Sequence, residues 1–302
     1  MWTILAFISA LCLGFYDISK KVALRDNRVI DVLTLSVCFS ALILSVPLLL
    51  SRTCPDLMMS TPFYVPTLDL QAHLFTVLKS VIVLSSWIFA YISLKHLPIS
   101  VVSPMQATRP MWTLVGALLI FGERLNTWQW IGVSLAIGTV FLFSFKNKSQ
   151  LSKSQIANPY YIALALAILI GACSGLYDKY LMRRYDHNAV QVYYTLYQAL
   201  MMLIVWSIEK YRKPKTSTLP GTRSLLPILL ISVFLIISDN VYMLALRDPD
   251  SLIAVVSTIR RGGAVIGFAY GLIVLKEQDP WRKVLCMLGI GAGLVCLAIG
   301  SI

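Results

Sequence analysis

Apolar stretches of about 20 residues, separated by short polar connections, recur along the whole chain. A helix of about 20 apolar residues crosses a hydrocarbon core roughly 30 Å thick, so each stretch predicts a transmembrane helix. The stretches are residues 3–22, 30–50, 74–94, 98–121, 128–145, 160–182, 190–209, 225–246, 250–275 and 281–301. The pattern therefore predicts an all-α polytopic membrane protein with ten transmembrane helices.

The fourth predicted helix resembles the ninth in sequence. Ile99-Ser-Val-Val-Ser103 recurs as Ile253-Ala-Val-Val-Ser257, and the same offset of 154 residues relates Glu123 to Glu277. Similar segments at a constant offset indicate an internal duplication, which many membrane transporters contain.

The first and sixth predicted helices extend this similarity, because Gly14-Phe-Tyr-Asp17 resembles Gly175-Leu-Tyr-Asp178. We therefore predict two copies of a five-helix unit, residues 1–146 and 160–302, joined by a linker at 147–159. Because five is odd, the second copy crosses the membrane in the opposite sense. The expected architecture is two inverted repeats.

The composition excludes several kinds of protein. With 58% hydrophobic and 13% charged residues, the chain does not have the composition of a soluble domain. Its six cysteines are scattered and form no C-x-x-C pair, so we expect neither a disulfide framework nor a metal site. No G-x-x-x-x-G-K-[ST] motif is present, so we expect no ATP hydrolysis and no cofactor.

The net charge of +12 is explained by the positions of the lysines and arginines. Of the 26, 16 fall in connections after odd-numbered predicted helices, five after even-numbered ones, and five within spans. Since these residues accumulate in cytoplasmic loops, the bias predicts cytoplasmic odd-numbered connections and both termini outside. We expect a plasma membrane, such as a bacterial inner membrane, and no nucleic acid partner.

A family resemblance appears where the first repeat ends. Gly122-Glu-Arg-Leu125, followed by Trp128 and Gly132, is similar to the EamA-like family of the drug/metabolite transporter superfamily, whose members commonly carry Gly-Glu near the fifth helix. The second repeat departs from this pattern, because Lys276 precedes Glu277. The resemblance implies an alternating-access carrier whose central cavity is lined chiefly by helices 1, 3, 4, 6, 8 and 9. It also implies cytoplasmic termini, opposite to the charge bias.

Three arginines lie near the middle of predicted spans, Arg109 in the fourth and Arg260 and Arg261 in the ninth. An ionisable side chain at the centre of a span costs about 2.5–3.5 kcal/mol on insertion scales, so a function is the first explanation. A guanidinium stays charged and presents a planar fork of donors suited to carboxylate or phosphate. We predict that these arginines, with Gln106 at the position matching Arg260, bind substrate. The alternative is that internal acids or backbone carbonyls neutralise them and they only lock the helices.

The charges within the spans predict an anionic substrate. Three acids (Asp17, Asp178 and Asp239) face five bases (Lys79, Arg109, Lys179, Arg260 and Arg261). A cavity with surplus positive charge attracts anions. Besides the arginines, the predicted substrate contacts are Lys79, Trp87, Asp239, Asn240, Tyr242 and Ser257.

The repeated tyrosine–aspartate pairs allow two interpretations. Asp17 and Asp178, with Tyr16, Tyr177 and Lys179, are candidates for proton coupling or gating. Alternatively, the two acids pair with neighbouring bases on their own helices (Lys20, Lys21, Lys179 and Arg183), and the spacing of the residues favours this pairing.

These patterns together predict a secondary transporter that moves a small polar metabolite, expected to be anionic, by alternating access. The alternative is an exporter of amino acids or drug-like metabolites with structural arginines. An enzyme is not expected, since no clustered nucleophile, metal-ligand set or carboxylate pair is present, and a scaffold or sensor would leave the arginines unexplained. The expected partners are the substrate and the lipid bilayer. Gly289-x-x-x-Gly293 allows close helix approach within the chain or between protomers, so a homodimer stays open.

Overall fold

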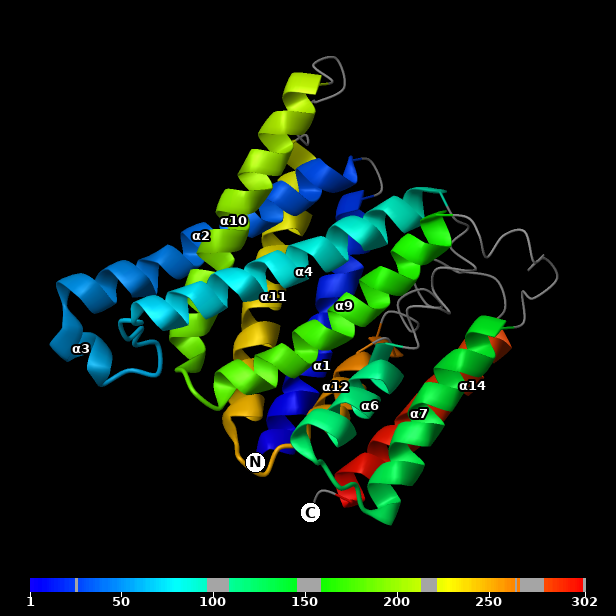
Figure 1. The fold of residues 1–302 in the computed structure, drawn as a ribbon. Coiled ribbons are helices and arrows are strands. Elements are labelled where there is room, and N and C mark those ends of the chain that lie inside the picture. Colours follow the sequence, from blue (N-terminus) through cyan, green and yellow to red (C-terminus); the bar gives the residue numbers. More distant parts are fainter. Residues whose placement is uncertain are drawn as a thin grey trace.

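The computed structural model describes residues 1–24, 27–96, 109–145, 159–212, 222–263, 265–266 and 280–300. Every regular element in these ranges is a helix (Figure 1). The helices are α1 (Trp2–Leu24), α2 (Val29–Thr53), α3 (Pro55–Met59), α4 (Leu70–His96), α6 (Arg109–Phe121), α7 (Thr127–Phe145), α9 (Pro159–Met182), α10 (His187–Arg212), α11 (Thr222–Arg247), α12 (Ile253–Arg261) and α14 (Pro280–Ile299). The predicted all-α class is confirmed for this part of the chain.

Six of these helices, α1, α2, α4, α9, α10 and α11, are long and apolar enough to cross a membrane. Several begin earlier than the hydropathy pattern predicts, α4 at Leu70 and α10 at His187, because helix ends continue past the apolar stretch into polar residues. Of the predicted spans 98–121 and 250–275, the structure describes α6 and α12. The rest of both spans lies almost wholly outside the described residues, so the ten-helix arrangement stays a prediction.

The outer faces of the long helices carry large, exposed apolar side chains. Examples are Leu11 on α1, Leu49 on α2, Leu74 on α4, Leu200 on α10 and Leu226 on α11. An apolar surface that extends over so many helices is unfavourable in water but suits contact with lipid chains. The exposed surface therefore agrees with an integral membrane protein.

Helices from the two halves of the chain pack on one another. The long helix α1 lies along α11, and α4 lies along α9 (Figure 1). α2 packs on α10, and α7 packs on α14. The short helices α6 and α12 pack on each other, with α6 also against α9 and α12 also against α1. Neither half therefore forms a separate core.

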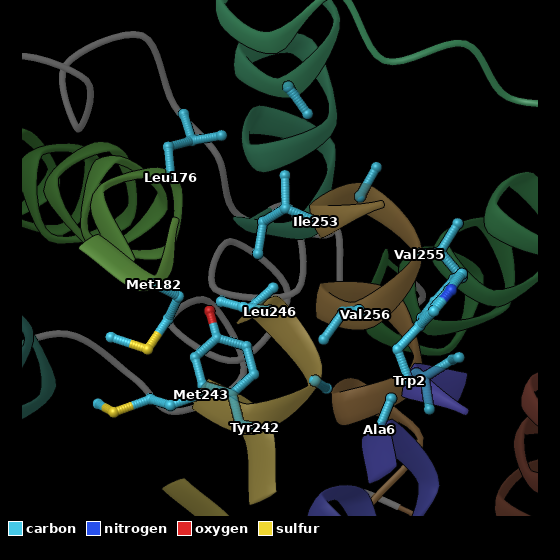
Figure 2. Packing of buried hydrophobic residues seen from close by; sticks show 14 of the residues in the cluster. Trp2, Ala6, Leu176, Met182, Tyr242, Met243, Leu246, Ile253, Val255 and Val256 are labelled. Carbon is cyan, nitrogen blue, oxygen red and sulfur yellow. The ribbon is translucent and has the colours of Figure 1, made fainter. Parts of the chain in front are cut away.

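The largest apolar cluster surrounds the first turns of α12 (Figure 2). Ile253 and Val256 of α12 are buried there, together with Trp2 of α1, Met182 of α9 and Leu246 of α11. These residues gather at the end of the bundle where α6, α9 and α11 end and α7, α10 and α12 begin. We call this the sealed end, because packed side chains fill the space between its helices.

Glycines allow α7 and α14 to approach closely. A Cβ atom on Gly293 would lie 2.9 Å from the carbonyl oxygen of Gly132, and one on Gly289 would lie 2.4 Å from the hydroxyl of Thr139. The Gly289-x-x-x-Gly293 motif is thus used between two helices of one chain. A homodimer stays a prediction.

This contact predicts that Gly293→Ala lowers the free energy of unfolding by about 1–3 kcal/mol, since the two backbones must move apart. Thermal unfolding of the detergent-purified protein measures the change. Gly291→Ala is the matched control on the same helix, because a Cβ there would have nothing within 4 Å. Equal effects of the two substitutions would contradict a role in close packing.

Candidate functional site

Arg260 on α12 forms an ion pair with Asp239 on α11. Its Nη2 lies 2.7 Å from the carboxylate Oδ1 and donates to the hydroxyl of Ser238 at 3.1 Å. The guanidinium also lies over the ring of Tyr242, with Cζ 4.0 Å from the ring centre. In this conformation an internal acid therefore neutralises Arg260, as the alternative to substrate binding expects.

All three predicted arginines lie near the middle of the bundle. Arg109 is the first residue of α6, and Arg260 and Arg261 are the last two of α12. With a rise of 1.5 Å per residue, Arg261 lies roughly 12 Å from the sealed end of α12, and Arg109 lies roughly 18 Å from the sealed end of α6. Both values correspond to mid-depth in a hydrocarbon core of roughly 30 Å.

Arg109 and Arg261 have no carboxylate partner among the described residues. Arg109 donates from Nη2 to the backbone carbonyl of Gly171 on α9. A Cβ at Gly171 would lie 2.6 Å from the Arg109 Cζ, so a larger residue there would displace the guanidinium. The Arg261 side chain is exposed, although α12 is surrounded by α1, α6, α7, α9, α11 and α14. Arg261 is therefore an exposed arginine at the end of a helix that lies inside the bundle.

Lys79 on α4 is paired with Asp178 on α9. The two side chains are 3% and 11% exposed, and the Lys79 ammonium lies 4.6 Å from the ring centre of Tyr194 on α10. The expectation that Asp178 pairs with a base on its own helix was wrong. Because α9 lies along α4, the face that carries Asp178 meets Lys79, whereas the adjacent Lys179 points about 100° away around the helix.

Lys179 is paired with Glu123, a residue that the sequence places in a connection rather than in the interior. Its ammonium lies 2.8 Å from the carboxylate Oε1, and both side chains are almost fully buried. Asp17, expected inside, is exposed and pairs with Lys20 at 2.9 Å. Among the described residues, the interior bases without carboxylate partners are therefore the two arginines Arg109 and Arg261.

The tyrosines beside the two aspartates make different contacts. The Lys20 ammonium lies 4.8 Å from the ring centre of Tyr16, within the same turn of α1. The hydroxyl of Tyr177 donates to the Phe75 carbonyl on α4, and its ring stacks on Tyr180. Of these contacts, only the bond of Tyr177 to Phe75 joins two helices, and the role in proton coupling stays a prediction.

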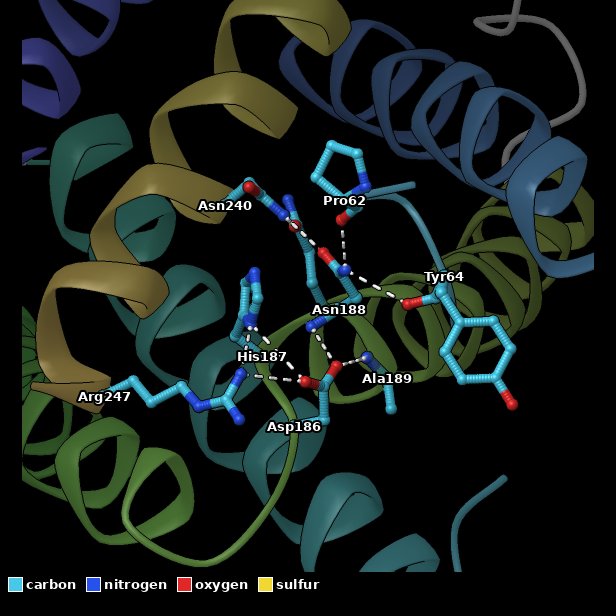
Figure 3. A network of polar contacts seen from close by, with 9 residues as sticks. Pro62, Tyr64, Asp186, His187, Asn188, Ala189, Asn240 and Arg247 are labelled. Carbon is cyan, nitrogen blue, oxygen red and sulfur yellow. Dashed lines mark hydrogen bonds and ion pairs between the residues drawn. The ribbon is translucent and has the colours of Figure 1, made fainter. Parts of the chain in front are cut away.

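Asn240, a predicted substrate contact, belongs to a network of polar contacts at the sealed end (Figure 3). Its amide donates to the side-chain oxygens of Asn188 and Gln191 on α10. Asn188 in turn donates to the carbonyls of Pro62 and Tyr64, between α3 and α4. The network joins α10, α11 and this connection, so the Asn240 amide is occupied by protein groups.

Asp186 anchors the start of α10 in the same network (Figure 3). It accepts from the backbone N–H groups of Asn188 and Ala189 and pairs with Arg247 at 3.1 Å. Burial raises the pKa of Asp186, but hydrogen bonds from His187 and Ala189 and the charge of Arg247 outweigh it, so the pKa is lowered. The stability that this carboxylate contributes is present above its unfolded pKa of about 3.9 and is lost as the pH falls through the lowered value.

The remaining predicted contacts are Trp87, Ser257 and Gln106. Trp87 packs beside the apolar cluster of Val37 and Ala199, between α4, α2 and α10. Ser257 is half-buried on α12. Gln106 lies outside the described residues.

A small polar hollow adjoins Asp239 between α2, α10 and α11. Its polar lining comprises Ser40, Gln191, Tyr194, Thr195, Gln198 and Asp239. Its volume of about 10 Å³ suits one water molecule, far below the roughly 300–1,000 Å³ of a ligand pocket. The buried Gln198 side-chain nitrogen has no hydrogen-bond partner among the described residues. At this hollow, the structure is closed to a metabolite.

Sequence reasoning missed the polar residues of α10, although a signal was present. Gln191, Thr195 and Gln198 lie at spacings of four and three, which place them on one face of a helix. A polar stripe on an otherwise apolar span points toward the interior of a bundle rather than toward lipid. The stripe accordingly lines the hollow beside Asp239.

Comparisons with known proteins find a matching family profile and a solved structure of similar fold. The sequence profile described as "EamA-like transporter family" matches residues 1–145. A solved structure described only as "Crystal structure of protein" is similar with a TM-score of 0.77 and 11% sequence identity, over 99% of this chain and 96% of that one. At this identity the likeness shows a shared fold and no more. No curated protein matches the sequence.

Proposed function

We propose, from the premise that residues 1–145 belong to the EamA-like transporter family, that the chain is a secondary transporter of a small anionic metabolite. The family indicates a membrane transporter of the drug/metabolite type. The observation that carries the anion assignment is the cluster of arginines at mid-depth, in which Arg109 and Arg261 lack carboxylate partners among the described residues. The transported group would be a carboxylate or a phosphate.

The packing of the helices supports alternating access between two repeats. In the two predicted repeats, α1, α2, α4, α6 and α7 correspond in order to α9, α10, α11, α12 and α14. When each helix is replaced by its counterpart, the contact of α1 with α11 becomes that of α9 with α4. In the same way, α1 with α12 becomes α9 with α6, and α2 with α11 becomes α10 with α4. Contacts related by such an exchange are those expected of the repeats 1–146 and 160–302, moving against each other about a central site.

The chemistry of the arginines favours a bidentate anion. Each guanidinium offers parallel N–H donors that match two oxygens of a carboxylate or phosphate, and such charge-assisted bonds are the stronger ones in proteins. A bound anion would meet Arg261 directly, while Arg109 would exchange its bond to the Gly171 carbonyl for one to the substrate. Arg260 would remain held by Asp239 and would add its field to the site.

One observation favours the alternative of an amino acid exporter. The ion pair of Arg260 with Asp239 presents both charges side by side at mid-depth, with 16% and 21% of the side chains exposed. A zwitterion would find a partner for its carboxylate and for its ammonium there. In that case the Arg260–Asp239 pair, rather than Arg109 and Arg261, would select the substrate.

The charge bias of the connections sets the proposed orientation. The sealed end carries the connections after even-numbered predicted helices, which hold five lysines and arginines against 16 at the opposite end. We therefore place the sealed end outside the cytoplasm, together with both termini. The proposed location is a plasma membrane such as a bacterial inner membrane.

Matched pairs of compounds test the anion assignment. Glucose 6-phosphate, AMP and succinate should each raise the unfolding temperature of the purified protein more than glucose, adenosine and succinamide. A ligand present at 100 times its Kd stabilises by about 2.7 kcal/mol. Compounds that stabilise are then assayed for uptake into proteoliposomes. Stabilisation by the neutral member of each pair alone would contradict the proposal, and stabilisation by zwitterionic amino acids would favour the exporter.

A further inference from the structure

The carboxylate of Glu123 joins the two halves of the chain at the sealed end. Glu123 follows α6, and its Oε1 accepts from the backbone N–H of Ile253 at 2.7 Å and its Oε2 from that of Ala254 at 3.2 Å. Lys179 of α9 donates to the same carboxylate and to the carbonyl of Ser251. All five residues are buried. We call these contacts the Glu123 clamp.

Local sequence explains why a distant acid is needed here. The N-cap of α12 is Leu252, whose side chain has no acceptor, so the first N–H groups of the helix require partners from elsewhere. Gly122 has a φ of 62°, a left-handed conformation that favours glycine, and it turns the chain after α6 so that Glu123 reaches α12. A negative charge is also favourable at the positive end of a helix. The Gly-Glu pair therefore works as a turn followed by a cap supplied to the other half.

The clamp ties together the two helices that carry the mid-depth arginines. Glu123 comes two residues after α6, which begins with Arg109, and it binds the first turn of α12, which ends with Arg261. α6 and α12 also pack on each other. A substrate that moves between the arginines and the sealed end must part these helices where the clamp holds them.

We propose that the Glu123 clamp is the gate of the transport cycle at the sealed end, with Glu123 as its gating residue. The clamp is closed in this structure, and it opens when the carboxylate leaves the N–H groups of α12 and the Lys179 ammonium. Water then hydrates both charges. Because the desolvation cost of a buried ion pair largely offsets its attraction, the pair can open reversibly without a large net change. This inference rests on the proposed function.

Cysteine accessibility tests the gate. Ser251 is 1% exposed and lies inside the clamp, whereas Ala189 is fully buried at the same end, on α10, away from α6 and α12. Each is changed to cysteine in a chain whose six native cysteines are replaced, and the reconstituted protein is treated with a membrane-impermeant maleimide. An opening gate should label Ser251→Cys at least tenfold faster than Ala189→Cys. Equal protection of both positions would overturn the proposal.

A second variant separates gating from simple destabilisation. Glu123→Gln keeps the shape of the side chain but removes its charge, so it should speed labelling of Ser251→Cys about tenfold and leave Ala189→Cys unchanged. An equal increase at both positions would mean that the clamp only stabilises the fold. If Glu123→Gln does not fold, the comparison with native Glu123 decides the question. The labelling experiment needs no transported ligand, so it is independent of the uptake assay. Anion uptake without labelling of Ser251→Cys would refute the gate alone. Labelling of Ser251→Cys without anion uptake would refute the transport proposal alone.

Discussion

Arg261→Ala is expected to reduce anion uptake about 10- to 100-fold, because a hydrogen bond to a charged group contributes about 1.5–3 kcal/mol. The Arg261 side chain is exposed at mid-depth and has no hydrogen-bond or ion-pair partner to lose among the described residues. Stability should therefore stay within about 0.5 kcal/mol of the native protein. Initial rates in proteoliposomes, with the anion selected by thermal shift, measure the effect.

Two further variants test whether the loss of anion uptake is specific to the Arg261 guanidinium. Arg261→Lys keeps the charge but loses the planar fork, so its uptake should fall between the native and alanine values. Arg260→Ala should instead lower both uptake and stability, because it leaves Asp239 without its partner. Native uptake by Arg261→Ala would refute the placement of the anion beside this arginine.

Lys79→Met is expected to lower the free energy of unfolding by about 3–5 kcal/mol, since it leaves the carboxylate of Asp178 buried and uncompensated. The side chains are 3% and 11% exposed, and α4 and α9 pack along each other around the pair. The double variant Lys79→Met/Asp178→Leu removes both charges and should recover most of the loss. Thermal unfolding in detergent measures all three proteins.

An exposed pair on α1 supplies the control. Lys20 and Asp17 form an ion pair with side chains 38% and 48% exposed, so Lys20→Met should change stability by less than about 1 kcal/mol. A loss as large as that of Lys79→Met would show that burial is not what makes the α4–α9 pair important. A double variant as unstable as Lys79→Met would also contradict the argument.

The sequence predicted the positions of the arginines but not their partners. Arg109, Arg260 and Arg261 stand out in apolar spans, and the structure places them at the start of α6 and the end of α12. Asp178 was expected to pair within its helix, yet its partner is Lys79. Spacing along one helix says which residues share a face, but the helix that this face meets depends on packing.

Glu123 illustrates the same limit. The sequence places it in a short polar connection, which is usually exposed, and only the internal repeat and the resemblance to a family singled it out. Its burial follows from the left-handed turn at Gly122 and from the position of α12 beside α6. The glycine is visible in the sequence, but the position of α12 does not follow from the residues around Glu123.

The amino-acid sequence was enough to predict the helical class and the location in a membrane. These properties follow from the length of each apolar stretch and the thickness of a bilayer, which are local along the chain. Only the tertiary structure decided which charges are paired, because pairing depends on how helices from the two halves rotate and pack. That packing joined Glu123 to α12 and left Arg261 exposed, without a carboxylate partner among the described residues.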